Sequence, residues 1–183
     1  MQTKFLIMIA VMLLLLSVSA HAEENIWLLI DTKKLVLEVK LADVTLVKFS
    51  NISIGRNGSG FKGKRGDDIT PKGRYKIAWI NRKSRYHLFF GFNYPSRENA
   101  QQALEKGLLN KKSYSKIIRA HNNTQVPPQN TPLGGLIGIH GLGGADKKIH
   151  EMMNWTHGCI ALTNDQINNL DTLIKKGTIV IVE

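Results

Sequence analysis

The first half of the chain carries short apolar runs that are typical of β-strands. Strands are expected at residues 26–30, 35–40, 44–54, 74–80 and 86–92. Within residues 35–40 the odd positions are apolar while Glu38 and Lys40 alternate with them, which indicates an antiparallel strand with one buried face. A glycine-rich loop is expected at residues 55–66, and a turn at Thr70-Pro71-Lys72-Gly73 precedes the fourth strand.

Helical signals begin in the middle of the chain. Ser96 suits the N-cap of a helix over residues 97–108, and a shorter helix is expected over residues 112–119. After an irregular, proline-containing segment at residues 122–135, a short apolar strand at 136–140 ends on His140.

The C-terminal part carries the clearest local signals. A short helix is expected over residues 146–153. Thr163 and Gln166 form a capping box for a following helix, and Gly177 suits the C′ position at its end. A closing strand is expected at residues 178–182. With 183 residues, 43% of them hydrophobic, and no repeat, the chain predicts one mainly β domain with a few helices, in the α+β class.

The N-terminal segment has the pattern of a secretory signal peptide. Lys4 precedes an apolar stretch over residues 5–16, and Ala20-His21-Ala22 fits the small-x-small cleavage rule. The alternative is an uncleaved anchor, but about twelve apolar residues fall short of the roughly 20 that span a bilayer. We therefore expect a signal peptide at residues 1–22, a mature domain at residues 23–183 without a membrane span, and a location in the periplasm or cell envelope.

The chain is basic, with 25 Lys and Arg against 14 Asp and Glu and a formal net charge of +11. The positive residues concentrate between Arg56 and Arg85, where the only acids are Asp67 and Asp68. This stretch is either a solvated face or a surface that attracts an anionic wall polymer or membrane. The export signal disfavours nucleic acid as a partner.

Cys159 is the only cysteine, so the chain cannot form an intramolecular disulfide. A lone cysteine is most often a small buried hydrophobe. Here Gly158 permits a tight turn just before the thiol, and the polar residues Thr156 and His157 flank it. Because a free thiol has a pKa near 8.5, a nucleophilic Cys159 would need a nearby base such as histidine.

Two histidines compete for the role of that base. His140 ends a glycine-bounded strand, which favours a rigidly held ring, whereas His157 lies two residues from Cys159. A zinc site formed by His140, His150, His157 and Cys159 is a third interpretation, but no pair has a recognised ligand spacing. His150 is more simply a surface residue or a support for the site, and we expect no metal.

The spacing of these residues resembles a known family. The pattern resembles the signature of the YkuD-type L,D-transpeptidase catalytic domain: a histidine, fifteen residues, and then the cysteine motif. Here these are His140 and Thr156-His157-Gly158-Cys159-Ile160. Thr70-Pro71-Lys72-Gly73 resembles the Thr-Pro-x-Gly turn of that family, and the resemblance spans residues 26–183. It implies a β-sandwich-like fold and a transferase that acts on peptidoglycan during cell wall biogenesis, without a cofactor.

The resemblance also implies a role for each site residue. Cys159 would attack the peptide bond before a terminal D-alanine of a peptidoglycan stem peptide, with His140 as the base and the Gly141 carbonyl orienting its ring. Backbone amides around His157, Gly158 and Cys159, in a turn that begins at Thr156, would stabilise the oxyanion. The amine of a second stem peptide would then resolve the acyl-enzyme.

Two departures from the family pattern leave it undecided which molecule accepts the acyl group from Cys159. Many members carry Asn or Arg where this chain has Ala161, and a long segment at residues 82–131 is expected to form a lid or acceptor wall. If water resolves the acyl-enzyme, the same residues make a hydrolase of cross-links or of peptidoglycan–protein links. A non-catalytic wall-binding module is a more distant alternative, since binding alone needs no thiol.

Overall fold

The structure is a computed structural model that describes residues 26–183, so the expected signal peptide lies outside the described residues. The strands are β1 (Ile26–Asp31), β2 (Val36–Leu41), β3 (Val44–Ser50), β4 (Ser59–Gly60), β5 (Thr70–Pro71), β6 (Gly73–Ser84), β7 (His87–Phe92), β8 (Gly138–His140), β9 (Ile160–Ala161) and β10 (Ile179–Val182). The helices are α2 (Arg97–Glu105), α3 (Lys111–Asn122), α4 (Lys147–Met152) and α5 (Asn164–Asp171). In this part of the chain, no helix is long and apolar enough to cross a membrane.

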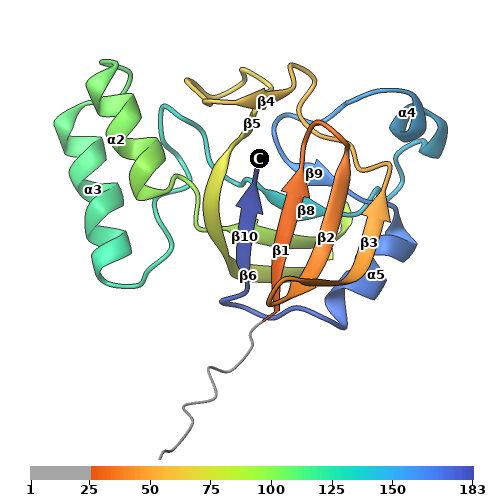
Figure 1. Cartoon of the computed structure of the whole chain (residues 1–183). Coiled ribbons are helices and arrows are strands. Elements are labelled where there is room, and N and C mark those ends of the chain that lie inside the picture. Colours follow the sequence, from red (N-terminus) through yellow and green to blue (C-terminus); the bar gives the residue numbers. More distant parts are fainter. Residues whose placement is uncertain (1–25) are drawn as a thin grey trace, which may run out of the picture.

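Eight strands form one mixed sheet in the order β3-β2-β1-β10-β6-β7-β8-β9, and β4 pairs with β5 separately. The pairs β1–β10 and β8–β9 are parallel. The long strand β6 belongs to both halves of the sheet, because its first part pairs with β10 and its second part with β7. In Figure 1 the strands of the two halves cross, so the sheet folds into two layers. The expected mainly β, sandwich-like fold is confirmed.

One hydrophobic cluster joins the two halves of the sheet to α5. In β2 the apolar residues Leu37 and Val39 are buried while Glu38 and Lys40 turn to the other face, as the alternation predicts. Ile167 and Leu170 of α5 are also fully buried in this cluster. The capping box that starts α5 is present, with hydrogen bonds of 2.9 and 3.2 Å between Thr163 and Gln166.

The segment at residues 82–131 contains a pair of helices attached to one end of the sheet. α2 and α3 pack side by side there, away from α4 and α5 (Figure 1). Ser96 caps α2 as expected. The buried Tyr75 hydroxyl of β6 donates a hydrogen bond of 3.0 Å to Asn99 of α2, and Tyr75 stacks on Phe92 with ring centroids 5.4 Å apart. The helix pair is therefore anchored to the core through β6.

Several expected element boundaries are wrong. The third strand ends at Ser50, because Asn51 adopts a positive φ of 57°. The helix expected to reach residue 108 ends at Glu105. Gly177 does not cap α5, which ends six residues earlier at Asp171; its φ of +97° serves a separate turn before β10.

Thr70 and Pro71, expected in a turn, form the short strand β5 instead. The parallel partner of β5 is β4, which lies within the expected glycine-rich loop. This pairing joins residues 59–60 to residues 70–71, which are not neighbours in the sequence, so the local pattern does not reveal it.

The basic stretch from Arg56 to Arg85 does not form one uninterrupted solvated face. Arg56 lies 3.5 Å from Asp68, and Arg82 lies 2.6 Å from Asp171 of α5. Lys62 is 3% exposed and is bonded to Asp67, so its side chain belongs to the interior.

Candidate active site

His140 and Cys159 come together because β8 and β9 are parallel neighbours. The register pairs Ile139 with Ile160 and His140 with Ala161. Since side chains alternate along a strand, Cys159, just before β9, lies on the same side of the sheet as His140. β8 is buried along its length, so the ring of His140 is mounted on a rigid element.

The environment of His140 selects one neutral tautomer. The ring is 3% exposed, and Nδ1 lies 2.7 Å from the carbonyl oxygen of Gly141. Because a carbonyl only accepts, Nδ1 carries the proton and Nε2 keeps its lone pair. Burial lowers the pKa of His140 to about 4, although the Gly141 hydrogen bond acts in the opposite direction. His140 is therefore a neutral base at pH 7.

Two aromatic side chains contact the His140 ring. Tyr86 stacks on it with centroids 4.5 Å apart, and Trp155 meets it edge-on at 5.7 Å. The Trp155 indole N–H donates to Nδ1 of His150 at 3.3 Å. His150 is buried, so the expectation of a surface position is wrong and the expectation of a supporting position fits.

The thiol of Cys159 is protonated in the resting structure. The side chain is half-buried, and Sγ donates to the carbonyl oxygen of Leu136 at 3.3 Å. Burial raises the pKa of Cys159 to about 11, while a hydrogen bond with the Gly138 backbone and the charge of Lys62 oppose that rise. The resting pair is thus a neutral thiol and a neutral imidazole.

Thr156 closes the turn that carries the thiol. Its buried hydroxyl donates to the carbonyl oxygen of Cys159 at 2.6 Å and accepts from the backbone N–H of Gly158 at 3.1 Å. Gly158 has φ +121°, and a Cβ there would lie 2.6 Å from the carbonyl oxygen of Ile69, so only glycine fits. The backbone N–H of Gly158 was expected to face the oxyanion, but it donates its hydrogen bond to the Thr156 hydroxyl instead.

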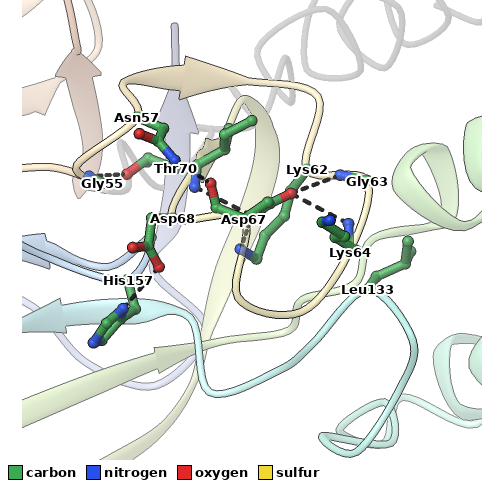
Figure 2. A network of polar contacts seen from close by, with 12 residues as sticks. Gly55, Asn57, Lys62, Gly63, Lys64, Asp67, Asp68, Thr70, Leu133 and His157 are labelled. Carbon is green, nitrogen blue, oxygen red and sulfur yellow. Dashed lines mark hydrogen bonds and ion pairs between the residues drawn. The ribbon is translucent and has the colours of Figure 1, made fainter.

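His157 points to Asp68 at the surface, as Figure 2 shows. Its side chain is 71% exposed, and Nδ1 lies 2.7 Å from Oδ1 of Asp68. The hydrogen bond from His157 lowers the pKa of Asp68, and Arg56 adds to the effect. Of the two histidines considered as the base, His140 is buried on β8, whereas His157 is exposed and hydrogen-bonded to Asp68.

The loop at residues 62–69 is a part of the site that the sequence did not reveal. The carboxylate of Asp67 accepts hydrogen bonds from the ammonium of Lys62 and from three backbone amides of the loop (Figure 2). The available signal was that Asp67 and Asp68 are the only acids in a strongly basic stretch. Trp155 was also missed, since a lone tryptophan before the motif has no distinctive spacing.

The four residues of the zinc interpretation do not form one site. Across residues 26–183, no three His, Cys, Asp or Glu side chains are grouped so that they could hold a metal ion. Each of the three histidines has a different hydrogen-bond partner: the Gly141 carbonyl for His140, the Trp155 indole for His150 and the Asp68 carboxylate for His157.

Known structures share the fold of this chain. The chain is similar in structure to the helical cell shape determining protein Pgp2 from Campylobacter jejuni, with a TM-score of 0.59 and 22% identity over 87% of this chain and 47% of that chain. It is also similar to Bd1075 from Bdellovibrio bacteriovorus, with a TM-score of 0.57 and 19% identity over 90% of this chain and 50% of that chain. At these identities the likeness shows the fold, and the chain spans about half the length of each of these structures.

A search of curated proteins finds no match. The family model for the L,D-transpeptidase catalytic domain matches residues 25–182, which is nearly the whole of the described chain. The chain therefore belongs to the L,D-transpeptidase catalytic domain family, whose members act on the cell wall outside the cytoplasm.

Proposed function

We propose that the protein is an exported cysteine acyltransferase that forms an acyl-enzyme on Cys159 with a peptidoglycan stem peptide. The observation that carries this proposal is the β8–β9 register, which puts the thiol on the same side of the sheet as a neutral imidazole. Family membership supplies the substrate class. The name of the similar Pgp2 extends the proposal to a role in cell shape.

In the first step, Sγ of Cys159 bonds to the carbonyl carbon of the residue before the terminal D-alanine. As that bond forms, the thiol gives up its hydrogen bond to the Leu136 carbonyl, and its proton passes to Nε2 of His140. The Gly141 carbonyl stabilises the resulting imidazolium through Nδ1–H. The imidazolium then protonates the D-alanine nitrogen as the peptide bond breaks, so the proton balance closes.

We assign the oxyanion to the backbone amides of His157 and Cys159. The Gly158 amide is bonded to Thr156, which instead fixes the shape of the turn. Removal of one donor from such a site typically lowers the rate by about 10²–10³.

The second step decides between transfer and hydrolysis. Ala161 is fully buried and has no polar group, so any substrate contact from an Asn or Arg side chain, which many family members carry at this position, is missing. This observation favours water as an acceptor beside the amine of a second stem peptide. A hydrolase of cross-links or of peptidoglycan–protein links is therefore the second candidate function.

We also propose that the mature domain binds an anionic wall polymer through exposed cations of β6. Arg74 and Lys76 border two surface hollows of about 690 and 890 Å³, which also share Lys176. If this contact is electrostatic, sedimentation with isolated walls should weaken as the Debye length falls from roughly 10 Å at 0.1 M salt to 3 Å at 1 M. Binding that does not change with salt would contradict it.

The test of the proposed function is incubation of the mature protein with muropeptides that carry tetrapeptide stems, followed by mass spectrometry of the products. New dimers indicate transfer, and shortened or separated stems indicate hydrolysis. We expect Cys159→Ser to abolish both, and His140→Gln to lower the rate by about 10²–10⁴. His87→Gln, at an exposed histidine of β7, is the matched control and should retain activity. Turnover that survives Cys159→Ser would exclude the cysteine mechanism.

A further inference from the structure

A buried lysine lies beside the turn of Cys159, and the mechanism above does not use it. The side chain of Lys62 is 3% exposed, and its ammonium is bonded to Oδ1 of Asp67. Burial of an ammonium is costly unless it is paired and hydrogen-bonded. A loop lysine with a long, flexible side chain would otherwise lie in solvent, as that of Lys64 does two residues later.

Asp67 fixes the position of this ammonium. Besides Lys62, its carboxylate accepts from the backbone amides of Gly63, Lys64 and Ile69 at 2.9, 3.2 and 3.2 Å (Figure 2). Burial raises the pKa of Asp67, but these hydrogen bonds and the charge of Lys62 outweigh it and lower the pKa overall. The carboxylate is therefore ionised and ties both ends of the loop to one point.

The loop at residues 62–69 packs directly against the turn that carries the nucleophile. The carbonyl oxygen of Ile69 approaches Gly158 so closely that a Cβ there would lie 2.6 Å away. Asp68 holds His157 at 2.7 Å. A shift of this loop would therefore move the turn before Cys159.

Lys62 and Cys159 also contact the same short segment of the chain. A Cβ on Gly134 would lie 3.6 Å from Cε of Lys62, and two residues later the Leu136 carbonyl accepts the thiol hydrogen bond. The charge of Lys62 also lowers the pKa of Cys159, in the direction opposite to the larger effect of burial.

The other cations near the turn lie at the surface rather than in the interior. Arg56 is exposed 3.5 Å from Asp68, and the exposed Arg65 is hydrogen-bonded to Asn130. His140 is neutral at pH 7. Among these groups, Lys62 is the buried cation, and a charge in the interior is screened less by solvent than one at the surface.

We infer that Lys62 is a positioning residue of the active site, whose ammonium, held by Asp67, favours the negative charge that develops on Cys159 as its proton leaves. The inference rests on the proposed function, since it concerns the same nucleophile. It predicts that loss of the ammonium makes the thiol less reactive, even though loosening of the loop would make the thiol more accessible.

The test measures alkylation of the folded protein by iodoacetamide between pH 7 and 9.5. Because Cys159 is the only cysteine, one mass increment on the intact protein reports this thiol alone. A rise of one unit in the thiol pKa reduces the thiolate tenfold, and the higher intrinsic nucleophilicity recovers about threefold of that. We therefore expect Lys62→Met to be alkylated more slowly than the wild type across this range, by about threefold for each unit by which the thiol pKa rises.

Three further variants separate charge from structure. Lys64→Met removes the same charge from an exposed side chain of the same loop and should match the wild type. Lys62→Arg restores the charge and should recover most of the rate. The double variant Lys62→Met/Asp67→Asn leaves no unpaired carboxylate, so it tests the ammonium even if Lys62→Met does not fold. Slower alkylation of the double variant supports the inference, and an unchanged or faster rate overturns it. Alkylation needs no peptidoglycan, so either result leaves the muropeptide test of the proposed function independent.

Discussion

Thr156 connects both ends of the nucleophile turn, and its hydroxyl can be removed without loss of volume. Thr156→Val deletes the donor to the Cys159 carbonyl at 2.6 Å and the acceptor for the Gly158 amide at 3.1 Å. The Gly158 amide would then lack its hydrogen bond at a buried position, and the Cys159 carbonyl would lack one at a partly buried position. Each unsatisfied buried group costs about 1–3 kcal/mol. Because neighbouring effects are not additive, we expect the free energy of unfolding to fall by about 2–4 kcal/mol.

Urea denaturation at pH 7, followed by tryptophan fluorescence, measures this change. Thr156→Ser is the control, because it keeps the hydroxyl and loses one methyl group worth about 0.8 kcal/mol. The turn of the valine variant should also release the Gly158 amide and change the rate of Cys159 alkylation. If Thr156→Val unfolds within about 0.5 kcal/mol of the wild type, the hydroxyl does not hold the turn and the reasoning is refuted.

Three other predictions follow from the same geometry. Asp67→Asn should lower the free energy of unfolding by about 3–5 kcal/mol, because it leaves the ammonium of Lys62 buried without its partner, and the double variant with Lys62→Met should recover most of the loss in urea denaturation. Gly158→Ala should lose muropeptide turnover and stability together, since its Cβ would meet the Ile69 carbonyl at 2.6 Å; a fully active, stable variant would contradict this. Between pH 6.5 and 4 the unfolded chain binds a proton that folded His140 does not, because its pKa is lowered to about 4. Stability from this residue is present above pH 6.5 and falls by about 3 kcal/mol down to pH 4, and His140→Gln should remove that part of the slope.

The elements that the sequence predicted best are those in which one local pattern decides the outcome. Alternation along β2 identified the buried positions Leu37 and Val39, and the capping box located the start of α5. The strand order was not available in this way. β10, at the end of the chain, lies between β1 and β6, and such pairing depends on contacts between distant segments.

The same distinction applies to the site. His140 and Cys159 could be named from residue type, glycine neighbours and spacing, since these features are local. Lys62 could not, because a lysine in a basic stretch is expected in solvent, and its burial depends on Asp67 and on the segment after residue 131. The hydrogen bond from the Gly158 amide to Thr156 could not be predicted either, since it depends on where the folded turn places the Thr156 hydroxyl.

The most direct test of the cysteine mechanism is intact-protein mass spectrometry of the wild-type protein, quenched in acid during the first turnovers on a muropeptide with a tetrapeptide stem. We expect an adduct equal in mass to the muropeptide less its terminal D-alanine, mapped to the peptide that contains Cys159. The adduct should be absent from Cys159→Ala. Product formation without any adduct on the wild type, or an adduct that persists in Cys159→Ala, would contradict acyl transfer through this thiol.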